Sequence, residues 1–127
     1  MTKHILLIDD ERDIREVAEV ALSVVGGWQV STAASGREGI AKAIANPPDA
    51  ILLDVMMPDM DGFATLQALR SQAATRSIPV ILLTAKVQSA DQHRFELWAV
   101  AAVLVKPFKA MQLAEQIAAI LQWPTAS

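Results

Sequence analysis

The sequence of 127 residues contains no cysteine, and this absence removes several classes of site. Disulfides, thiolate metal centres and cysteine nucleophiles are excluded, in agreement with a reducing compartment. No apolar run approaches the ~20 residues of a membrane-spanning helix, and the run from Ile5 to Ile8 is too short for a signal peptide. We therefore expect a cytoplasmic protein that does not contact a membrane.

Positive charge is also scarce. Eleven Lys and Arg residues oppose 14 Asp and Glu residues, the net charge is −3, and no basic cluster is present. Because nucleic-acid binding requires a basic face, we expect no direct contact with nucleic acid. The chain has the length of one domain, and its 53% hydrophobic content indicates a sheet that is covered on both faces.

Two apolar periods alternate along the chain. Short apolar runs predict strands at residues 4–8, 28–32, 50–54, 78–83 and 101–105. Helical spacing predicts helices at residues 12–25, 35–44, 63–73, 89–98 and 111–121, with Ser35 and Glu38 at the spacing of a capping box. Five strands alternating with five helices predict an α/β fold, a doubly wound parallel sheet in a single domain.

Polar residues follow four of the predicted strands. Asp9 and Asp10 follow the first, and Asp54, Thr84 and Lys106 end or follow the third, fourth and fifth. The carboxyl ends of parallel strands share one edge, where open α/β sheets keep their ligand sites. Two carboxylates ~4 Å apart repel by about 4 kcal/mol at an effective dielectric near 20, so three together require a counter-ion. Oxygen ligands without thiolates favour a partly hydrated Mg²⁺.

Each of these residues also has an ordinary structural interpretation. Asp9, Asp10 or Asp54 taken singly could cap the following segment, a threonine after a strand is often a turn residue, and a lysine is usually solvated. Independent caps and turns need not converge on four strand ends. The joint pattern therefore favours a common site.

Five motifs in order resemble the receiver domain of bacterial two-component response regulators, over about residues 4–122. The motifs begin at residues 8, 53, 60, 83 and 106, and they read IDDE, LDVMMP, MDG, LTAK and KPF. The resemblance implies a flavodoxin-like fold with strand order 2-1-3-4-5. It also implies that Asp54 accepts a phosphoryl group from the phosphohistidine of a sensor histidine kinase, from a phosphotransfer protein or from a small acyl phosphate.

The resemblance further implies roles for the neighbouring residues. Asp10 would bind Mg²⁺ directly, Asp9 through water and Met56 through its backbone carbonyl, and Asp54 would also belong to the metal site. Mg²⁺ and Lys106 would neutralise the transferring phosphoryl oxygens. Thr84 would hydrogen-bond the bound phosphoryl group with help from the Ala85 N–H, and the Lys106–Pro107 peptide is expected to be cis.

Two departures concern the fifth strand. Val103 stands where receivers usually carry the aromatic that reports phosphorylation, and Ala99-Val100-Ala101 replaces the usual Gly-Ala-Asp. We therefore expect readout by loop and helix shifts, through residues between Phe95 and Val105 and the last helix. Trp98, Val100 and Val103 are expected to form an exposed apolar patch for a partner or a second copy. The alternative is that Trp98 packs onto the sheet.

Nothing but residues 124–127 follows the last helix, so we expect a stand-alone receiver, with a fragment of a longer protein as the alternative. Such a chain is not an enzyme acting on other substrates. It would catalyse its own phosphorylation and slow dephosphorylation, and it would signal by protein contact. A degenerate receiver used as a constitutive docking module is one rival. An aspartyl-nucleophile phosphatase is another, although Met56 stands where such enzymes place a second aspartate.

Overall fold

The computed structural model describes residues 2–57, 60–85 and 99–125. The strands are β1 (His4–Ile8), β2 (Gln29–Ala33), β3 (Ala50–Asp54), β4 (Val80–Thr84) and β5 (Ala102–Val105), and the helices are α1 (Arg12–Val24), α2 (Gly36–Ala45), α3 (Gly62–Arg70) and α5 (Ala110–Leu121). The helix predicted at residues 89–98 lies outside the described residues. No helix within the described ranges has the length and apolar character to cross a membrane.

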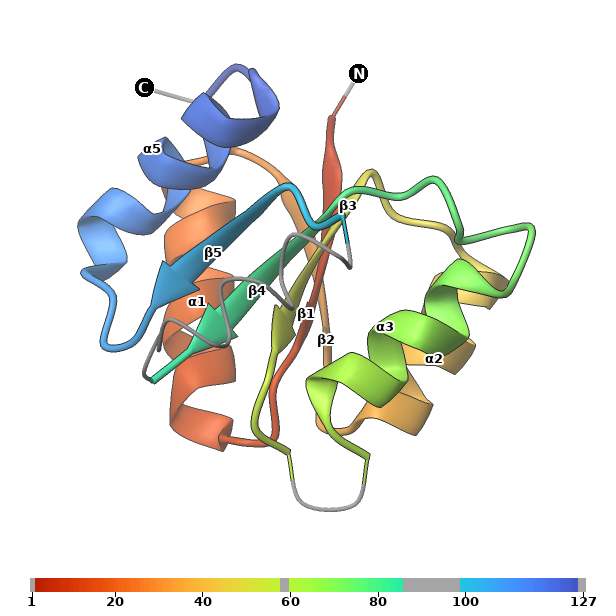
Figure 1. Ribbon diagram of the computed structural model, residues 1–127. Helices are drawn as coiled ribbons and strands as arrows, with labels where there is room; N and C mark the ends of the chain where they lie inside the picture. The colour runs from red at the N-terminus through yellow and green to blue at the C-terminus, as the bar shows by residue number, and fades with distance from the viewer. Residues whose placement is uncertain (1, 58–59, 86–98, 126–127) are drawn as a thin grey trace.

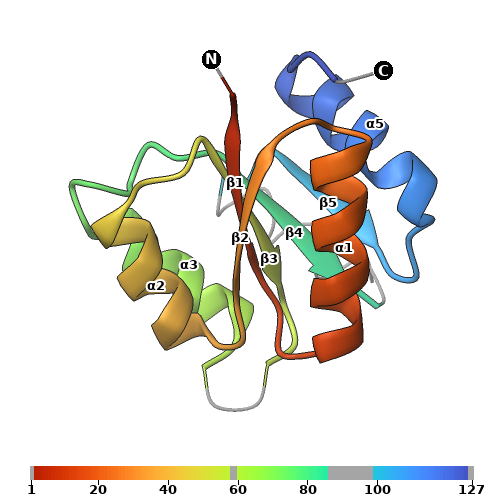
Figure 2. The ribbon, with the colours of Figure 1, turned by 180° about the vertical axis from the view of Figure 1, so that it is seen from behind.

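The five strands form one parallel sheet in the order β2-β1-β3-β4-β5. This confirms the predicted parallel sheet and its flavodoxin-like strand order. Helices α1 and α5 cover one face and α2 and α3 cover the other (Figures 1 and 2). Because all four strand pairings are parallel, the carboxyl ends of the five strands lie at the same edge of the sheet.

Alternation along the strands creates a separate core on each face of the sheet. On the α2 and α3 side, Leu6, Ile51 and Leu82 pack with Leu66 of α3. On the α1 and α5 side, the intervening strand residues pack with helix residues such as Leu22 and Ile117. Strands β3 and β4 are buried along their whole length, as expected for central strands covered on both faces.

Helix α3 ends at Arg70, three residues earlier than the apolar spacing predicts. Side-chain hydrogen bonds take over from the helical ladder at this point. Thr75 Oγ1 donates to the Leu69 carbonyl at 2.6 Å, and Arg70 Nη1 donates to the carbonyls of Arg76 and Ile78 at 2.9 and 2.8 Å. These bonds hold residues 71–78 in turns. Strand β4 then begins at Val80, two residues later than predicted.

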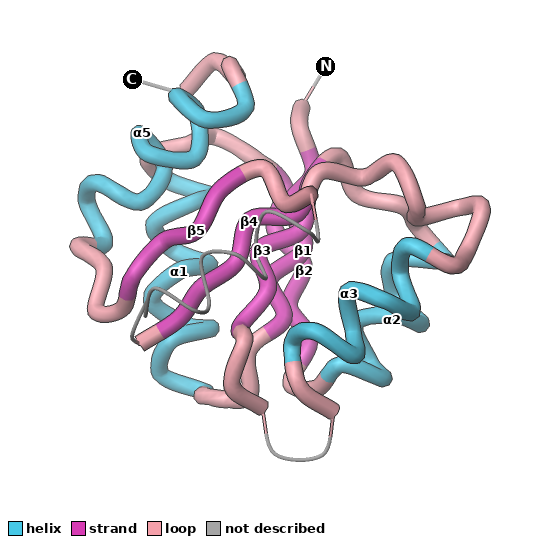
Figure 3. Tube along the Cα trace, viewed as in Figure 1, coloured by secondary structure: helices cyan, strands magenta, loops and turns pink. Residues whose placement is uncertain are grey.

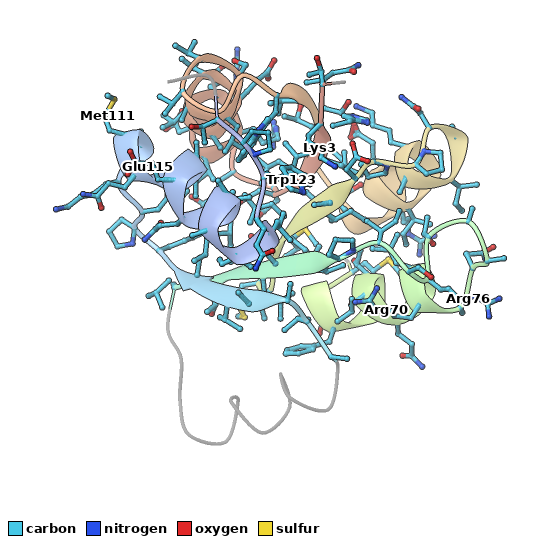
Figure 4. All side chains as sticks on the ribbon, turned by 90° about the horizontal axis from the view of Figure 1, so that it is seen from above. Lys3, Arg70, Arg76, Met111, Glu115 and Trp123 are labelled. Atoms are coloured by element: carbon cyan, nitrogen blue, oxygen red, sulfur yellow. The ribbon has the colours of Figure 1, made fainter. Side chains whose placement is uncertain are left out.

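Both ends of the described chain lie at the end of the sheet opposite the carboxyl ends of the strands (Figure 1). Trp28 and Trp123 meet edge to face with ring centroids 5.0 Å apart, and Trp28 Nε1 donates to the Pro124 carbonyl at 3.0 Å. Lys3 lies beside Trp123, with its ammonium 5.6 Å from a ring centroid (Figure 4). These contacts fasten the end of α5 to the start of β1 and β2.

The expected exposed patch beside β5 is wrong for the two of its residues that the structure describes. Val100 and Val103 are half-buried and pack against the core on the α2 and α3 side. The reason is register, because Val103 pairs with the buried Leu82 in the neighbouring strand β4. Trp98 lies outside the described residues.

Ala99 adopts a left-handed backbone conformation with φ 52°. A Cβ atom in this region costs about 1–2 kcal/mol, which glycine avoids. We expect Ala99→Gly to raise the free energy of unfolding by about 1 kcal/mol, measured by urea denaturation. The neighbouring exposed Ala101, for which no positive φ is recorded, provides the control: Ala101→Gly should lower stability slightly because it loosens the unfolded chain. Equal effects of the two substitutions would contradict the strain at Ala99.

Candidate functional site

The candidate site lies at the carboxyl ends of β1, β3, β4 and β5, in the loops along one edge of the sheet (Figure 3). One carboxylate oxygen from each of Asp9, Asp10 and Asp54 lies within 4.8 Å of the other two. Thr84 ends β4, and Lys106 directly follows β5. The structure therefore brings the first and third strand ends together with the lysine, as the sequence predicts.

The carboxylates differ in their access to solvent. Asp9 and Asp54 are buried, at 0% and 2% exposure, whereas Asp10 is exposed. Buried carboxylates are costly to desolvate unless a cation lies beside them. Lys106 supplies that cation. Its Nζ lies 2.9 Å from Asp9 Oδ2, 3.4 Å from Asp54 Oδ1 and 3.8 Å from Glu11 Oε1.

Short backbone and side-chain hydrogen bonds orient the two buried carboxylates. Asp9 Oδ1 accepts from the Glu11 N–H at 2.9 Å, and the Asp9 carbonyl accepts from Arg15 Nη1 at 2.8 Å. Asp54 Oδ1 accepts from the Met56 N–H at 3.2 Å. Both aspartates therefore hold the start of the turn that follows their strand through Oδ1, and the second oxygen of each, Oδ2, takes no part in that bond.

The second oxygen of Asp54 is the feature that points to a ligand. Asp54 Oδ2 is buried and has no hydrogen-bond partner among the described residues. Buried polar atoms are almost always paired, so an orphaned carboxylate oxygen beside two further carboxylates fits a hard cation. Asp9, Asp10 and Asp54 thus form a donor set of the kind that Mg²⁺ prefers. The expectation that the Met56 backbone carbonyl also binds the metal stays a prediction.

Electrostatics at the site raise the pKa of both Asp54 and Lys106. Burial, and after it the negative charge of Asp9, raise the pKa of Asp54 to about 6 against the opposing positive charge of Lys106. Burial by itself would lower the pKa of Lys106, but hydrogen bonding to Asp9 and the charges of Asp9, Asp54 and Glu11 outweigh it and raise the pKa overall. At neutral pH the site therefore contains a firmly protonated ammonium and a carboxylate that carries its charge at a cost.

The β4 and β5 ends are joined through their backbones. The Lys106 N–H donates to the Thr84 carbonyl at 2.7 Å, and Thr84 is 4% exposed. The Lys106–Pro107 peptide is cis, as predicted. Thr84 therefore lies at the same edge as the acidic group, although its predicted contact with a phosphoryl group stays a prediction.

Two residues of the site were missed by the sequence analysis. Glu11 contacts Lys106, and Arg15 binds the Asp9 carbonyl. Glu11 directly follows the aspartate pair, and this adjacency was an available signal. Arg15 could not have been identified, because only its side-chain direction distinguishes it from Arg12, the other arginine of α1.

Comparison with known proteins agrees with this geometry. Residues 5–118 match the family model described as response regulator receiver domain. The chain is 38% identical over 120 residues to the "Probable transcriptional regulator ycf27" of Cyanophora paradoxa, which covers 94% of this chain and 48% of that protein. It is 36% identical over 118 residues to the DNA-binding dual master transcriptional regulator RpaA of Synechocystis sp., covering 93% and 48%. The chain thus spans about half the length of the curated relatives it matches.

Solved structures show the same fold. The chemotaxis response regulator CheY4 of Vibrio cholerae matches with a TM-score of 0.88 and 32% identity, over 94% of this chain and 99% of that chain. The N-terminal domain of a response regulator receiver protein from Methanoculleus marisnigri matches with a TM-score of 0.78 and 37% identity, over 95% and 98%.

The raised pKa of Asp54 predicts an unusual pH dependence of stability in metal-free protein. Between its ordinary pKa of 3.8 and about 6, the folded state holds the Asp54 proton more tightly than the unfolded state. The free energy of unfolding should therefore fall, by up to about 3 kcal/mol, as pH rises through this window. Asp54→Asn should remove the fall and be more stable than wild type at pH 7, as measured by urea denaturation in a chelator.

Glu115→Gln is the matched control for this prediction, because Glu115 is an exposed carboxylate on the outer side of α5 (Figure 4). It should keep the pH profile of wild type. A wild-type stability that rises between pH 4 and 6 as steeply as that of Asp54→Asn would contradict the electrostatic account of Asp54.

Proposed function

Because this chain belongs to the response regulator receiver domain family, we propose that it is a phosphoacceptor signalling switch in which Asp54 accepts the phosphoryl group. The donor is the phosphohistidine of a sensor histidine kinase or phosphotransfer protein, or a small acyl phosphate. The observation that carries the proposal is the buried, unpartnered Oδ2 of Asp54 beside the Lys106 ammonium and two further carboxylates.

In the proposed step, a carboxylate oxygen of Asp54 forms a bond to phosphorus while the bond from phosphorus to the donor's leaving group breaks. The leaving group departs with the electron pair, and Asp54 becomes a mixed anhydride. Asp54 is suited to the attack because its carboxylate is buried beside the Lys106 ammonium and the backbone N–H of Met56 orients its Oδ1.

The main requirement of phosphoryl transfer is neutralisation of charge on the transferring group. Lys106 contributes a positive charge that is almost buried, at 11% side-chain exposure, and already directed at Asp54. Asp9, Asp10, Asp54 and the Met56 carbonyl would hold Mg²⁺, which when bound supplies further positive charge to the phosphoryl oxygens. Thr84, at the end of the adjacent strand, donates a hydroxyl hydrogen bond to the product phosphoryl group.

The phosphorylated chain signals by protein contact rather than by acting on a substrate. Residues between Phe95 and Val105 and helix α5 are the proposed output face in the cytoplasm. The half-buried Val103 leaves no aromatic at that position to rotate, so movement of loops and helices carries the signal. The relatives named as transcriptional regulators are about twice as long as this chain, and the DNA binding in the name of the Synechocystis protein is said of that protein alone.

Incubation with acetyl phosphate and Mg²⁺ should add one phosphoryl group, seen as a gain of about 80 Da by mass spectrometry of the intact protein. Asp54→Asn should show no gain, because the amide cannot form the anhydride. Glu115→Gln should behave as wild type. Turnover of many phosphate esters would support the phosphatase instead, and absence of any gain in wild type would favour the docking module.

Millimolar Mg²⁺ should raise the melting temperature, because the folded carboxylate cluster binds the ion and the unfolded chain does not. At ten times the dissociation constant the stabilisation is about 1.4 kcal/mol. Asp10→Ala should abolish most of this gain, and Glu115→Ala should retain it. An unchanged Mg²⁺ effect in Asp10→Ala would place the ion elsewhere.

A further inference from the structure

Glu11 lies at the mouth of the site in a position that helix capping does not explain. It is the N-cap residue of α1, yet its side chain makes no capping hydrogen bond. Its backbone N–H is bound to Asp9 Oδ1 at 2.9 Å, and its Oε1 lies 3.8 Å from Lys106 Nζ. The turn that orients Asp9 therefore also directs Glu11 toward the ammonium that serves Asp54.

The position of Glu11 at the N-terminus of α1 explains why a negatively charged residue is favourable there, but not why its side chain approaches Lys106. Acidic side chains are favourable in the first turn of a helix, but Asp13 already provides one in α1. N-cap positions usually carry Ser, Thr, Asp or Asn because their short side chains reach the free backbone N–H groups. A glutamate that bypasses those groups and approaches Lys106 serves the site rather than the helix.

Burial separates the site into an inner and an outer layer. Asp9, Asp54 and Lys106 form the inner layer, with side chains at 0%, 3% and 11% exposure. Asp10 and Glu11 form the outer layer, and the Glu11 side chain is 61% exposed. A phosphodonor arriving from solvent therefore meets two carboxylates before it meets the ammonium, and its own negative charge is repelled by them.

We propose that Glu11 sets the charge preference of the site, so that a dianionic acyl phosphate is disfavoured relative to a phosphoramidate donor that carries one net negative charge. This inference rests on the proposed function, since it concerns the donor to Asp54. Asp10 is expected to be neutralised by the ion it binds, whereas Glu11 keeps its charge in the path of the donor. Glu11 is a specificity-determining residue here, and it takes no part in bond making.

The two donor classes use the same attack by Asp54 and differ in what leaves. With an acyl phosphate, the phosphorus–oxygen bond to the acyl group breaks and a carboxylate leaves with the electron pair. With phosphoramidate, the phosphorus–nitrogen bond breaks and ammonia leaves, its nitrogen already carrying the required proton. Neither step needs an oxidant, a reductant or another reactant, so a difference in rate between the donors reports on charge and chemistry at the site.

The test is to compare Glu11→Gln with wild type, using acetyl phosphate and phosphoramidate at saturating Mg²⁺, with phosphorylation rates measured by intact mass. For charges about 7 Å apart in water at low salt, Glu11→Gln should speed acetyl phosphate about fourfold and phosphoramidate about twofold. In about 0.5 M salt both increases should fall below ~1.5-fold. Glu16→Gln is the matched control, an exposed glutamate one turn along α1 that pairs with Arg12, and it should change neither rate appreciably.

Glu11→Gln rates equal to wild type for both donors, or increases that are the same for both and persist in high salt, would overturn the charge preference. A slower Glu11→Gln would overturn it too, and would assign Glu11 to holding Lys106 in place. The Mg²⁺-induced rise in melting temperature, measured for each variant, shows whether metal binding is intact. If wild type itself gains no phosphoryl group on Asp54, the proposed function fails; if wild type is phosphorylated and the donor preference is unchanged, only this inference fails.

Discussion

The ion pairs between Lys106 and the two buried aspartates are the constraint on which the site depends. Asp9 and Asp54 are almost inaccessible to solvent, and Lys106 lies within 3.4 Å of an oxygen of each. Removing one partner of a buried ion pair typically costs about 3–5 kcal/mol, because the remaining charge is left without compensation. Among the described residues a single ammonium opposes several carboxylates, so the charge of this group is only partly neutralised and the group retains its affinity for a further cation.

The parallel sheet keeps these charges apart from the hydrophobic cores. Apolar side chains cover both faces of β3 and β4, which confines the charges to one edge and leaves the cores free of unpaired polar groups among the described residues apart from that edge. Tryptophan packing and a cation–π contact fasten the opposite end. The end of the sheet that the tryptophans fasten and the end that carries the charges are thus separated by the length of the strands. A change in charge at Asp54 therefore acts on the loops at the carboxyl ends of the strands.

The elements that sequence patterning mispredicted share a physical cause. Helix α3 stops at Arg70 because Thr75 and Arg70 offer backbone carbonyls an alternative to the helical ladder, which apolar spacing does not reveal. Val103 looked exposed beside an apolar segment, but pairing with Leu82 turns it toward the core. In both cases the side chain has a partner beyond the few residues whose apolar spacing was used, so that spacing could not predict the contact.

The sequence by itself determined the parallel α/β architecture and, through its resemblance to receivers, the strand order. It also determined that five polar residues meet at one edge of the sheet: Asp9, Asp10, Asp54, Thr84 and Lys106. It could do so because the two apolar periods and the residues after each strand are local properties of the sequence. Only the tertiary structure decided which of the carboxylates lie next to the Lys106 ammonium and which oxygen lacks a hydrogen bond. It showed that Lys106 lies closer to Asp9 than to Asp54, that Asp54 Oδ2 is left without a hydrogen bond among the described residues, and that Glu11 joins the group. Distances of this kind depend on side-chain directions and on loops from strands far apart in the chain, and these are set only when the sheet is assembled.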